Sequence, residues 1–211
     1  MKPNKIHYFR KPPTESIIAF SGGVDSMVLL HSYIKRGNTA ALLHVDHNTD
    51  WCKQELEFAQ YTSNKYGLVL IKKRIPEFDG STSLEHFWSK HRNAVYHALR
   101  KPILTGHNLD DAVEWYIMST MQGTAKLLNY SNQNVFRPMI TTKKEHIYLY
   151  ADHYKIPYLT DPTNLDDRFN LRNNVRANLI PQIELVFPGI YTTVRRLITE
   201  KEAKLDTSNR V

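Results

Sequence analysis

A short buried strand that turns directly into an amphipathic helix constrains the fold of this chain more than any other feature. Residues 16–20 are apolar and partly β-branched, as in a strand that is covered on both faces. Ser21, Gly22 and Gly23 break this strand, and apolar residues then recur with a helical period from Asp25 to Arg36. A strand that passes straight into a helix is half of the unit from which parallel sheets are built.

The same alternation continues along the rest of the chain. Further strands are predicted at residues 39–45, 68–72, 102–105 and 157–160, and further helices at residues 50–66, 83–99, 110–121, 142–154, 171–186 and 190–205. We therefore predict an α/β fold with a Rossmann-like, doubly wound, mostly parallel sheet and a C-terminal helical extension. In such sheets ligands bind beyond the carboxyl ends of the strands, near the point where the strand order reverses.

The length of 211 residues allows one sizeable core with small additions at its ends. We predict a polar N-terminal arm over residues 1–14, an α/β domain over residues 15–188 and a C-terminal helix and tail over residues 189–211. The segment from Thr142 to Glu145 has the pattern of a capping box, and Pro181 is expected to interrupt the helix in which it lies.

Composition narrows the class of protein. No apolar stretch approaches the roughly 20 residues that span a bilayer, so no membrane partner is expected. Cys52 is the one cysteine, which excludes an internal disulfide, and the N-terminus lacks a secretory signal; both features favour a cytoplasmic protein. The net charge of +7 fits a polyanionic partner such as RNA, and it fits an ordinary basic surface equally well.

The turn after the first strand has the properties of a phosphate-binding loop. Gly22 and Gly23 allow the backbone to approach a ligand closely, and the N-terminus of the following helix favours an anion. Ser21 and Ser26 add hydroxyl groups. Asp25 would repel phosphate unless it holds a bridging Mg²⁺. The alternative is an ordinary helix start with Asp25 as a cap.

A second group of polar residues follows the strand predicted at residues 102–105. His107, Asp110, Asp111 and Glu114 begin the next helix, and three of them share one face because they lie three or four residues apart. Carboxylates so close together repel one another unless they bind a cation or an amine. Acidic residues are also common at helix starts, so a structural role is the alternative.

The segment from Ser21 to Ser26 resembles the phosphate loop of the N-type ATP pyrophosphatases. It matches the Ser-Gly-Gly-x-Asp-Ser motif of that superfamily, Val24 filling the variable position, and it is not followed by the Gly-Lys-Ser/Thr of a Walker loop. The resemblance implies an adenine nucleotide alpha-hydrolase-like fold, cleavage of ATP between its α- and β-phosphates, and Mg²⁺ held by Asp25 through the phosphates.

A longer series of segments resembles the tRNA(Ile)-lysidine synthetases within that superfamily. The family's His-x-x-Asp-Asp-x-x-Glu segment is matched by His107–Glu114, and its Arg-Pro-Met segment by Arg137–Met139. Its Asp-x-Thr-Asn-x-Asp segment is matched by Asp161–Asp166, and its Arg-Asn-x-x-Arg segment by Arg172–Arg176. Glu85 and Arg92 match a helix of the family, so the resemblance extends from about residue 16 to residue 188.

The resemblance implies a reaction and roles for these residues. The family adenylates C2 of the wobble cytidine of an isoleucine tRNA with a CAU anticodon, and free lysine then displaces AMP. Asp25, His107, Asp110, Asp111 and Glu114 would be catalytic, and Asp111 and Glu114 would bind the lysine amine. Residues 21–26 would bind ATP together with Leu43, His44 and Gly106. The phosphate or tRNA contacts would come from Arg92, Arg137, Arg172 and Arg176.

These arginines and the later segment also have simpler interpretations. Arg172 and Arg176 lie one helical turn apart, so they could form a solvated stripe or pair with Asp166 and Asp167. The segment Asp161–Asn164 could be a turn and no more.

The chain departs from the family in several places. No basic residue follows His47 at once, the stretch after Glu114 has one glycine, Gly123, and Ser89 stands where an arginine is usual. A separate C-terminal tRNA-binding domain is not expected, so recognition would rest on the anticodon stem-loop or on a homodimer, or the substrate would differ. The rival functions are tRNA thiolation, a small-molecule amidoligase, and a repurposed nucleotide-binding protein.

Overall fold

The order of the strands determines where polar groups can meet. The computed structural model describes residues 4–160 and 171–208. Its sheet has the order β3-β2-β1-β4-β6-β5. The strands are β1 (Glu15–Ala19), β2 (Thr39–Asp46), β3 (Val69–Arg74), β4 (Ile103–Leu104), β5 (Ser131–Asn132) and β6 (Val135–Phe136). All neighbours pair in parallel except β5 with β6. The chain therefore winds from β1 to β3 in one direction and resumes at β4 on the other side of β1.

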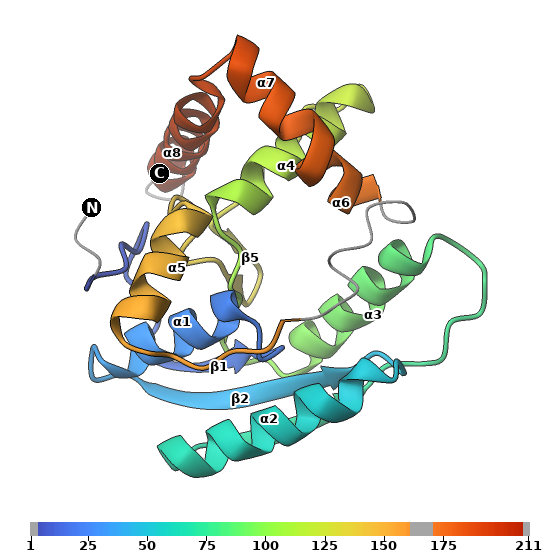
Figure 1. Ribbon diagram of the computed structural model, residues 1–211, viewed down its shortest axis with the longest axis vertical. Coiled ribbons are helices and arrows are strands. Elements are labelled where there is room, and N and C mark those ends of the chain that lie inside the picture. The colour runs from blue at the N-terminus through green and yellow to red at the C-terminus, as the bar shows by residue number, and fades with distance from the viewer. Residues whose placement is uncertain (1–3, 161–170, 209–211) are drawn as a thin grey trace.

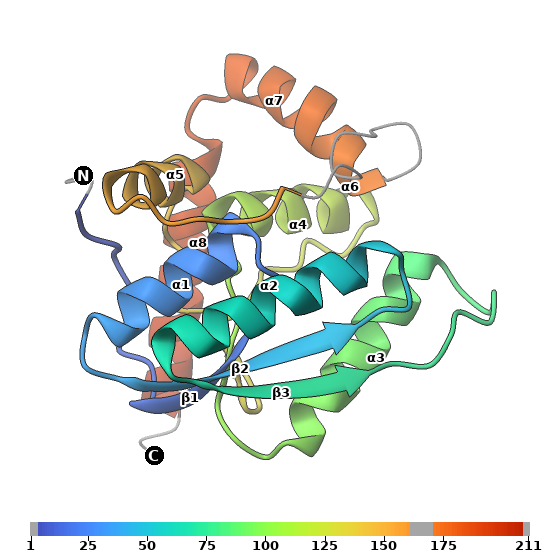
Figure 2. The same ribbon diagram turned by 60° about the horizontal axis from the view of Figure 1, so that its bottom comes forward.

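The helices cover both faces of this sheet. They are α1 (Val24–Ile34), α2 (Trp51–Tyr66), α3 (Leu84–Ala98), α4 (Leu109–Met121), α5 (Lys144–His153), α6 (Leu171–Asn174), α7 (Ile180–Val186) and α8 (Ile190–Ser208). Helices α1 and α2 lie together on one face and α3 lies on the other (Figure 2). Helices α4, α6, α7 and α8 gather at the end of the molecule opposite β2 and α2 (Figure 1).

Neighbouring residues of each central strand point into different cores. Ile18 and Leu42 pack with α1, α2 and α5, whereas Ile17 and Leu43 pack with α3. All four side chains are buried, which explains why the strands are nearly continuous apolar runs. A third cluster joins α4 to α7 and α8 around Val113 and Val194. The predicted C-terminal helix therefore packs against the α/β domain.

Helix boundaries follow from local chemistry in most places. Gly67 ends α2 in the left-handed conformation, and the Ser83 hydroxyl accepts a hydrogen bond from the first turn of α3. A π-helical turn, Val175–Leu179, separates α6 from α7. Pro181 lies at the start of α7, and its missing N–H and bulky ring disturb the turn before it. The predicted interruption near Pro181 is confirmed.

Two expectations about local structure were wrong, and one element was not predicted. Residues 157–160 form no strand; the Leu159 N–H donates to the Gly22 carbonyl, so this segment packs beside the phosphate loop. The sheet is extended by the short β5–β6 hairpin, whose two-residue strands give almost no periodic signal. Thr142 does not cap α5, because its hydroxyl donates to the His7 carbonyl.

The N-terminal arm is attached to the core. Ile6 is buried in the α1 cluster, and the Phe9 N–H donates to the Pro138 carbonyl at 2.8 Å. Arg10 reaches α8 and pairs with Asp206. Within the described residues, none of the helices combines the length and the apolar character that crossing a membrane requires.

Candidate active site

The predicted polar segments meet at the point where the strand order reverses. The phosphate loop follows β1, and the segment from Gly106 to Glu114 follows β4, which is the neighbour of β1. The carboxyl ends of parallel strands lie at one edge of a sheet, so both segments reach the same edge. This position explains why residues about 80 positions apart in the chain are in contact, as the Asn108–Asp25 hydrogen bond shows.

The phosphate loop has the backbone geometry that its two glycines predict. Gly22 has a φ of 78°, and a Cβ there would come within 2.9 Å of Phe58. Gly23 precedes α1 without a side-chain cap, and a Cβ there would make only an ordinary contact, 3.5 Å from the Ser21 hydroxyl oxygen. The first N–H groups of α1 are therefore not capped by a side chain of the loop. Ser21 is exposed, but the buried Ser26 hydroxyl donates to the Gly23 carbonyl at 2.9 Å and so stabilises the loop.

Asp25 is held between two partners. One oxygen accepts a hydrogen bond from the Lys144 ammonium at 2.5 Å, and the other accepts one from the Asn108 amide at 3.1 Å. Burial raises the pKa of Asp25, and the charge of Lys144 opposes that shift. Lys144 therefore balances the charge of the Asp25 carboxylate beside the phosphate loop.

Gly106 permits the two segments to touch. A Cβ at this position would lie 2.9 Å from the Asp25 Cβ and 3.1 Å from the Asp25 carbonyl carbon. Such distances are too short for two carbon atoms that are not bonded. Because one of the neighbouring atoms belongs to the Asp25 backbone, it has little freedom to move away. The predicted contact of Gly106 with the nucleotide is untested; its observed role is to bring α4 against the loop.

The start of α4 is fixed by a capping box. The Asn108 side chain accepts hydrogen bonds from the Asp110 and Asp111 N–H groups, and one Asp111 oxygen accepts from the Asn108 N–H. His107 precedes this cap and shares a hydrogen bond of 2.8 Å with the Thr105 hydroxyl. Burial, reinforced by the charge of Arg137, lowers the pKa of His107 to about 3. The imidazole is therefore neutral near pH 7.

Asp110 connects three helices. One of its oxygens accepts a hydrogen bond from the Lys144 N–H at the start of α5, and the other accepts one from the Tyr191 hydroxyl of α8. This arrangement makes Asp110 the cap of α5 in place of the predicted Thr142. Its observed contacts support a positioning role, because they join the start of α4 to α5 and α8.

Glu114 is fully buried and pairs with two arginines. Its two carboxylate oxygens accept hydrogen bonds from the Nε atoms of Arg172, at 2.6 Å, and Arg176. Arg176 also pairs with Asp111 at 2.7 Å, and Arg172 pairs with Glu85 at 2.7 Å. Burial raises the pKa of Glu114, and the two guanidinium groups oppose that shift. The predicted amine site and two of the predicted phosphate-binding arginines are thus one ion-pair network.

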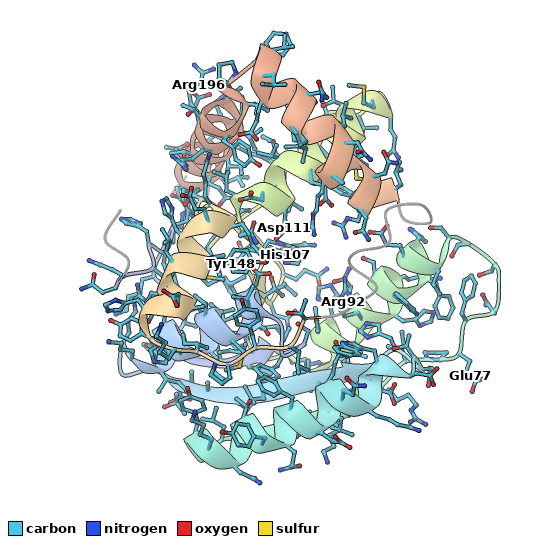
Figure 3. The ribbon with its side chains drawn as sticks, in the orientation of Figure 1. Glu77, Arg92, His107, Asp111, Tyr148 and Arg196 are labelled. Carbon is cyan, nitrogen blue, oxygen red and sulfur yellow. The ribbon has the colours of Figure 1, made fainter. Side chains whose placement is uncertain are left out.

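The remaining predicted residues surround this network. Arg92 extends from α3 toward the central region where His107 and Asp111 lie (Figure 3). Arg137 follows β6 and donates to the Asn129 carbonyl at 3.1 Å. The segment Asp161–Asp166, with Asp167, lies outside the described residues.

The two residues predicted at the adenine differ in their surroundings. The side chain of Leu43 belongs to the core beside α3, and its carbonyl accepts the Phe20 N–H. His44 is 2% exposed, and within the described chain its Nε2 has no hydrogen-bond partner. Burial lowers the pKa of His44. His44 therefore has a free nitrogen at the carboxyl end of β2, whereas Leu43 contributes to packing.

Lys144 and Asn108 both hydrogen-bond to Asp25, and neither was predicted from the sequence as a site residue. Asn108 is adjacent to the predicted histidine and fits a helix cap by type. A lysine in the first turn of a helix, such as Lys144, is unfavourable next to the helix dipole. The unfavourable position of this lysine was the one sign in the sequence that it needs an acidic partner.

A divalent cation would depend on Asp25. Within residues 4–160 and 171–208, no cluster of three or more histidine, cysteine, aspartate or glutamate side chains could hold a metal ion. Mg²⁺ is commonly held by one or two carboxylates together with substrate phosphates, and Asp25 beside the loop fits that donor set.

The chain is similar to proteins of one family over nearly its whole length. Residues 3–183 match the family model described as the PP-loop domain. The tRNA(Ile)-lysidine synthase of Francisella tularensis subsp. novicida is 29% identical, over 92% of this chain and 51% of that protein. The enzyme of the same name from Persephonella marina is 30% identical, over 82% of this chain and 42% of that protein. The chain spans about half the length of these curated relatives.

Solved structures support the fold. A U34-tRNA thiolase, NcsA from Methanococcus maripaludis, superposes with a TM-score of 0.72 over 90% of this chain and 72% of that chain, at 17% identity. An NH3-dependent NAD synthetase from Campylobacter jejuni gives a TM-score of 0.51 over 91% of this chain and 86% of that chain, at 16% identity. These similarities confirm the predicted fold class.

Replacing Gly106 with alanine tests the close approach of the two segments. We expect Gly106→Ala to lower the free energy of unfolding by about 1–3 kcal/mol, because the new methyl group overlaps Asp25. Chemical denaturation measures this change. Gly189→Ala is the control, since its methyl group would meet nothing within 4 Å, and it should cost less than about 1 kcal/mol. Equal effects of the two substitutions would contradict the proposed contact.

The neutral state of His107, which is half-buried, predicts a pH dependence of stability. The pKa of His107 is about 3 in the folded protein and lies near 6.5 in the unfolded chain. The contribution of the neutral imidazole to the free energy of unfolding is therefore complete above about pH 6.5, and it is lost as the pH falls toward 3. His107→Asn should therefore lose less stability than the wild type between pH 7 and pH 5. Denaturation across this range measures the difference, with the exposed His153→Asn as control. A steeper loss in His107→Asn would contradict the assignment.

Proposed function

This chain belongs to the PP-loop domain family, and on that basis we propose that it uses ATP to modify a tRNA. The reaction would be adenylation of C2 of the wobble cytidine of an isoleucine tRNA with a CAU anticodon, followed by ligation of lysine. The similarity to tRNA(Ile)-lysidine synthases supports this choice of substrates.

One observation carries the proposal. The phosphate loop and the acidic start of α4 are in direct contact, through the hydrogen bond between Asn108 and Asp25 at 3.1 Å. A triphosphate on the loop would therefore lie next to carboxylates suited to an amine. A two-step ligation needs this arrangement, because the nucleotide and the amine act in turn on the same carbon atom.

The first step would take place at the phosphate loop. The N–H groups at the start of α1 and the Lys144 ammonium would bind the phosphates of ATP, while Asp25 and those phosphates would hold Mg²⁺. The cytidine O2 would attack the α-phosphorus and pyrophosphate would leave. His44, with its free nitrogen at the end of β2, would contact the base of the nucleotide.

The second step would take place at the start of α4. The ε-amine of lysine would attack C2, and AMP would leave with the former O2 atom. Asp111 and Glu114 would bind the ammonium form of lysine, and one of them would accept the proton that the attacking nitrogen loses. His107, being neutral, would position the reacting groups by hydrogen bonding. Arg92 and Arg137 would contact the RNA backbone, and a homodimer would add surface for the tRNA.

The thiolation alternative has less support from the chain itself. Thiolation of tRNA generally needs cysteines that carry sulfur or a cluster. Cys52 is the one cysteine of the sequence; it is buried and contacts Thr49.

Lysine incorporation tests the proposal directly. With ATP, Mg²⁺, labelled lysine and an unmodified isoleucine tRNA bearing a CAU anticodon, we expect acid-precipitable label on the tRNA. A tRNA whose wobble cytidine is replaced by uridine should remain unlabelled. Absence of label on both tRNAs, in an assay where a lysidine synthase of established activity labels the first, would contradict the proposed reaction.

Asp25 should be required for pyrophosphate release. Asp25→Asn removes the charge that would hold Mg²⁺ against the phosphates, so we expect release to fall by about 100-fold or more. A coupled pyrophosphate assay measures the rate. Asp152→Asn is the matched control, because Asp152 is exposed and pairs with Lys155 on the surface of α5. Equal rates in the two variants would remove Asp25 from this role.

A further inference from the structure

The proposed amine site is occupied by a side chain of the protein itself. Arg176 donates hydrogen bonds to both Asp111, at 2.7 Å, and Glu114. These are the two carboxylates that the proposed function assigns to the lysine ammonium. A guanidinium and an ammonium need the same acceptor oxygens, so they compete for this site.

The two arginines of the network are not equivalent. Arg172 bridges Glu114 and Glu85 and is 30% exposed, so it is held from two helices, α3 and α4. Arg176 is 49% exposed, and both of its acidic partners belong to α4. Asp111 and Glu114 raise the pKa of Arg176 against the effect of burial, so its charge is retained. Arg172 is therefore the fixed partner of Glu114, and Arg176 is the one that can leave.

If Arg176 moves away, the buried Glu114 carboxylate still has a cationic partner. Glu114 is 0% exposed, and leaving such a carboxylate without a cation is costly. Arg172 keeps one oxygen of Glu114 paired after Arg176 leaves. An incoming ammonium can then replace Arg176 on the second oxygen and on Asp111. The exchange conserves charge at the site.

The local backbone provides a means of withdrawal. Arg176 lies in the π-helical turn Val175–Leu179, where each turn contains an extra residue. If this turn became α-helical, the residues after it would rotate about the helix axis relative to the residues before it. The rotation would be about 100°, which is the angle between successive residues of an α-helix. Because Arg172 precedes the turn, it could stay on Glu114 while Arg176 rotates away. Turns of this kind are common at functional sites.

We propose that Arg176 is a displaceable plug that closes the acidic site of α4 until an amine substrate replaces it. The identity of the amine as lysine rests on the proposed function, but the displacement itself requires only a primary ammonium. The plug keeps the acidic site neutral in the free protein. It also lowers apparent amine affinity, because only the open fraction of the protein binds the ligand.

The test compares amine binding in Arg176→Gln and in the wild type. Two probes are used, free lysine and n-butylammonium, which shares the amine but lacks the amino-acid group. Their affinities are measured by ligand-observed NMR, and thermal unfolding confirms that each variant is folded. We expect Arg176→Gln to bind n-butylammonium about tenfold more tightly than the wild type. Arg176→Lys, which keeps the charge but loses the planar fork, should lie between them.

Arg196→Gln is the control for loss of a positive charge at a distance. Arg196 is 67% exposed on α8 and lies 3.8 Å from Glu200, so its loss should leave the affinity for both probes unchanged. An equal gain in Arg196→Gln and Arg176→Gln would contradict the plug, since the effect would then reflect net charge.

The outcomes separate this inference from the proposed function. Unchanged or weaker binding of n-butylammonium to folded Arg176→Gln would overturn the plug, whatever happens with lysine. Tighter binding of n-butylammonium, with no binding of lysine to any variant, would support the plug and contradict lysine as the substrate. Tighter binding of both probes would support both.

Discussion

The close approach of the loop after β1 to the segment after β4 is the constraint on which the rest of the site depends. It requires a residue without a side chain at Gly106, where a Cβ would lie 2.9 Å from that of Asp25. The strand order brings these two segments together, because β1 and β4 are neighbours at the point where the winding reverses. Without this contact, the phosphate loop and the acidic start of α4 would lie apart in the structure.

Internal pairing of charges is the second property of the site. Lys144 neutralises Asp25, and Arg172 and Arg176 neutralise Glu114. Each proposed substrate carries a group that can take over one of these interactions: phosphates can pair with Lys144, and an ammonium can pair with the carboxylates of α4. The protein thereby keeps a charged, partly buried site stable before its substrates arrive.

The sequence was sufficient for the features that depend on local pattern. The strand before Ser21, the helix after it and the acidic start of α4 follow from periodicity and helix-cap chemistry, and the alternation of strands and helices indicates a mostly parallel sheet. The partners of the charged residues could not be predicted, because Arg176 lies 62 positions from Glu114 and Lys144 lies 119 positions from Asp25. The capping role of Asp110 was missed for the same reason. The strands of the β5–β6 hairpin are too short for their periodicity to be seen.

In the proposed reaction, ATP and an amine act in turn on one carbon atom at this site. Isotope transfer measures it most directly: a tRNA whose wobble cytidine carries ¹⁸O at C2 is converted with ATP and lysine, and the AMP is analysed by mass spectrometry. We expect the AMP to carry the ¹⁸O, because the adenylated oxygen leaves with it. Unlabelled AMP accompanying the formation of product would contradict the proposed reaction.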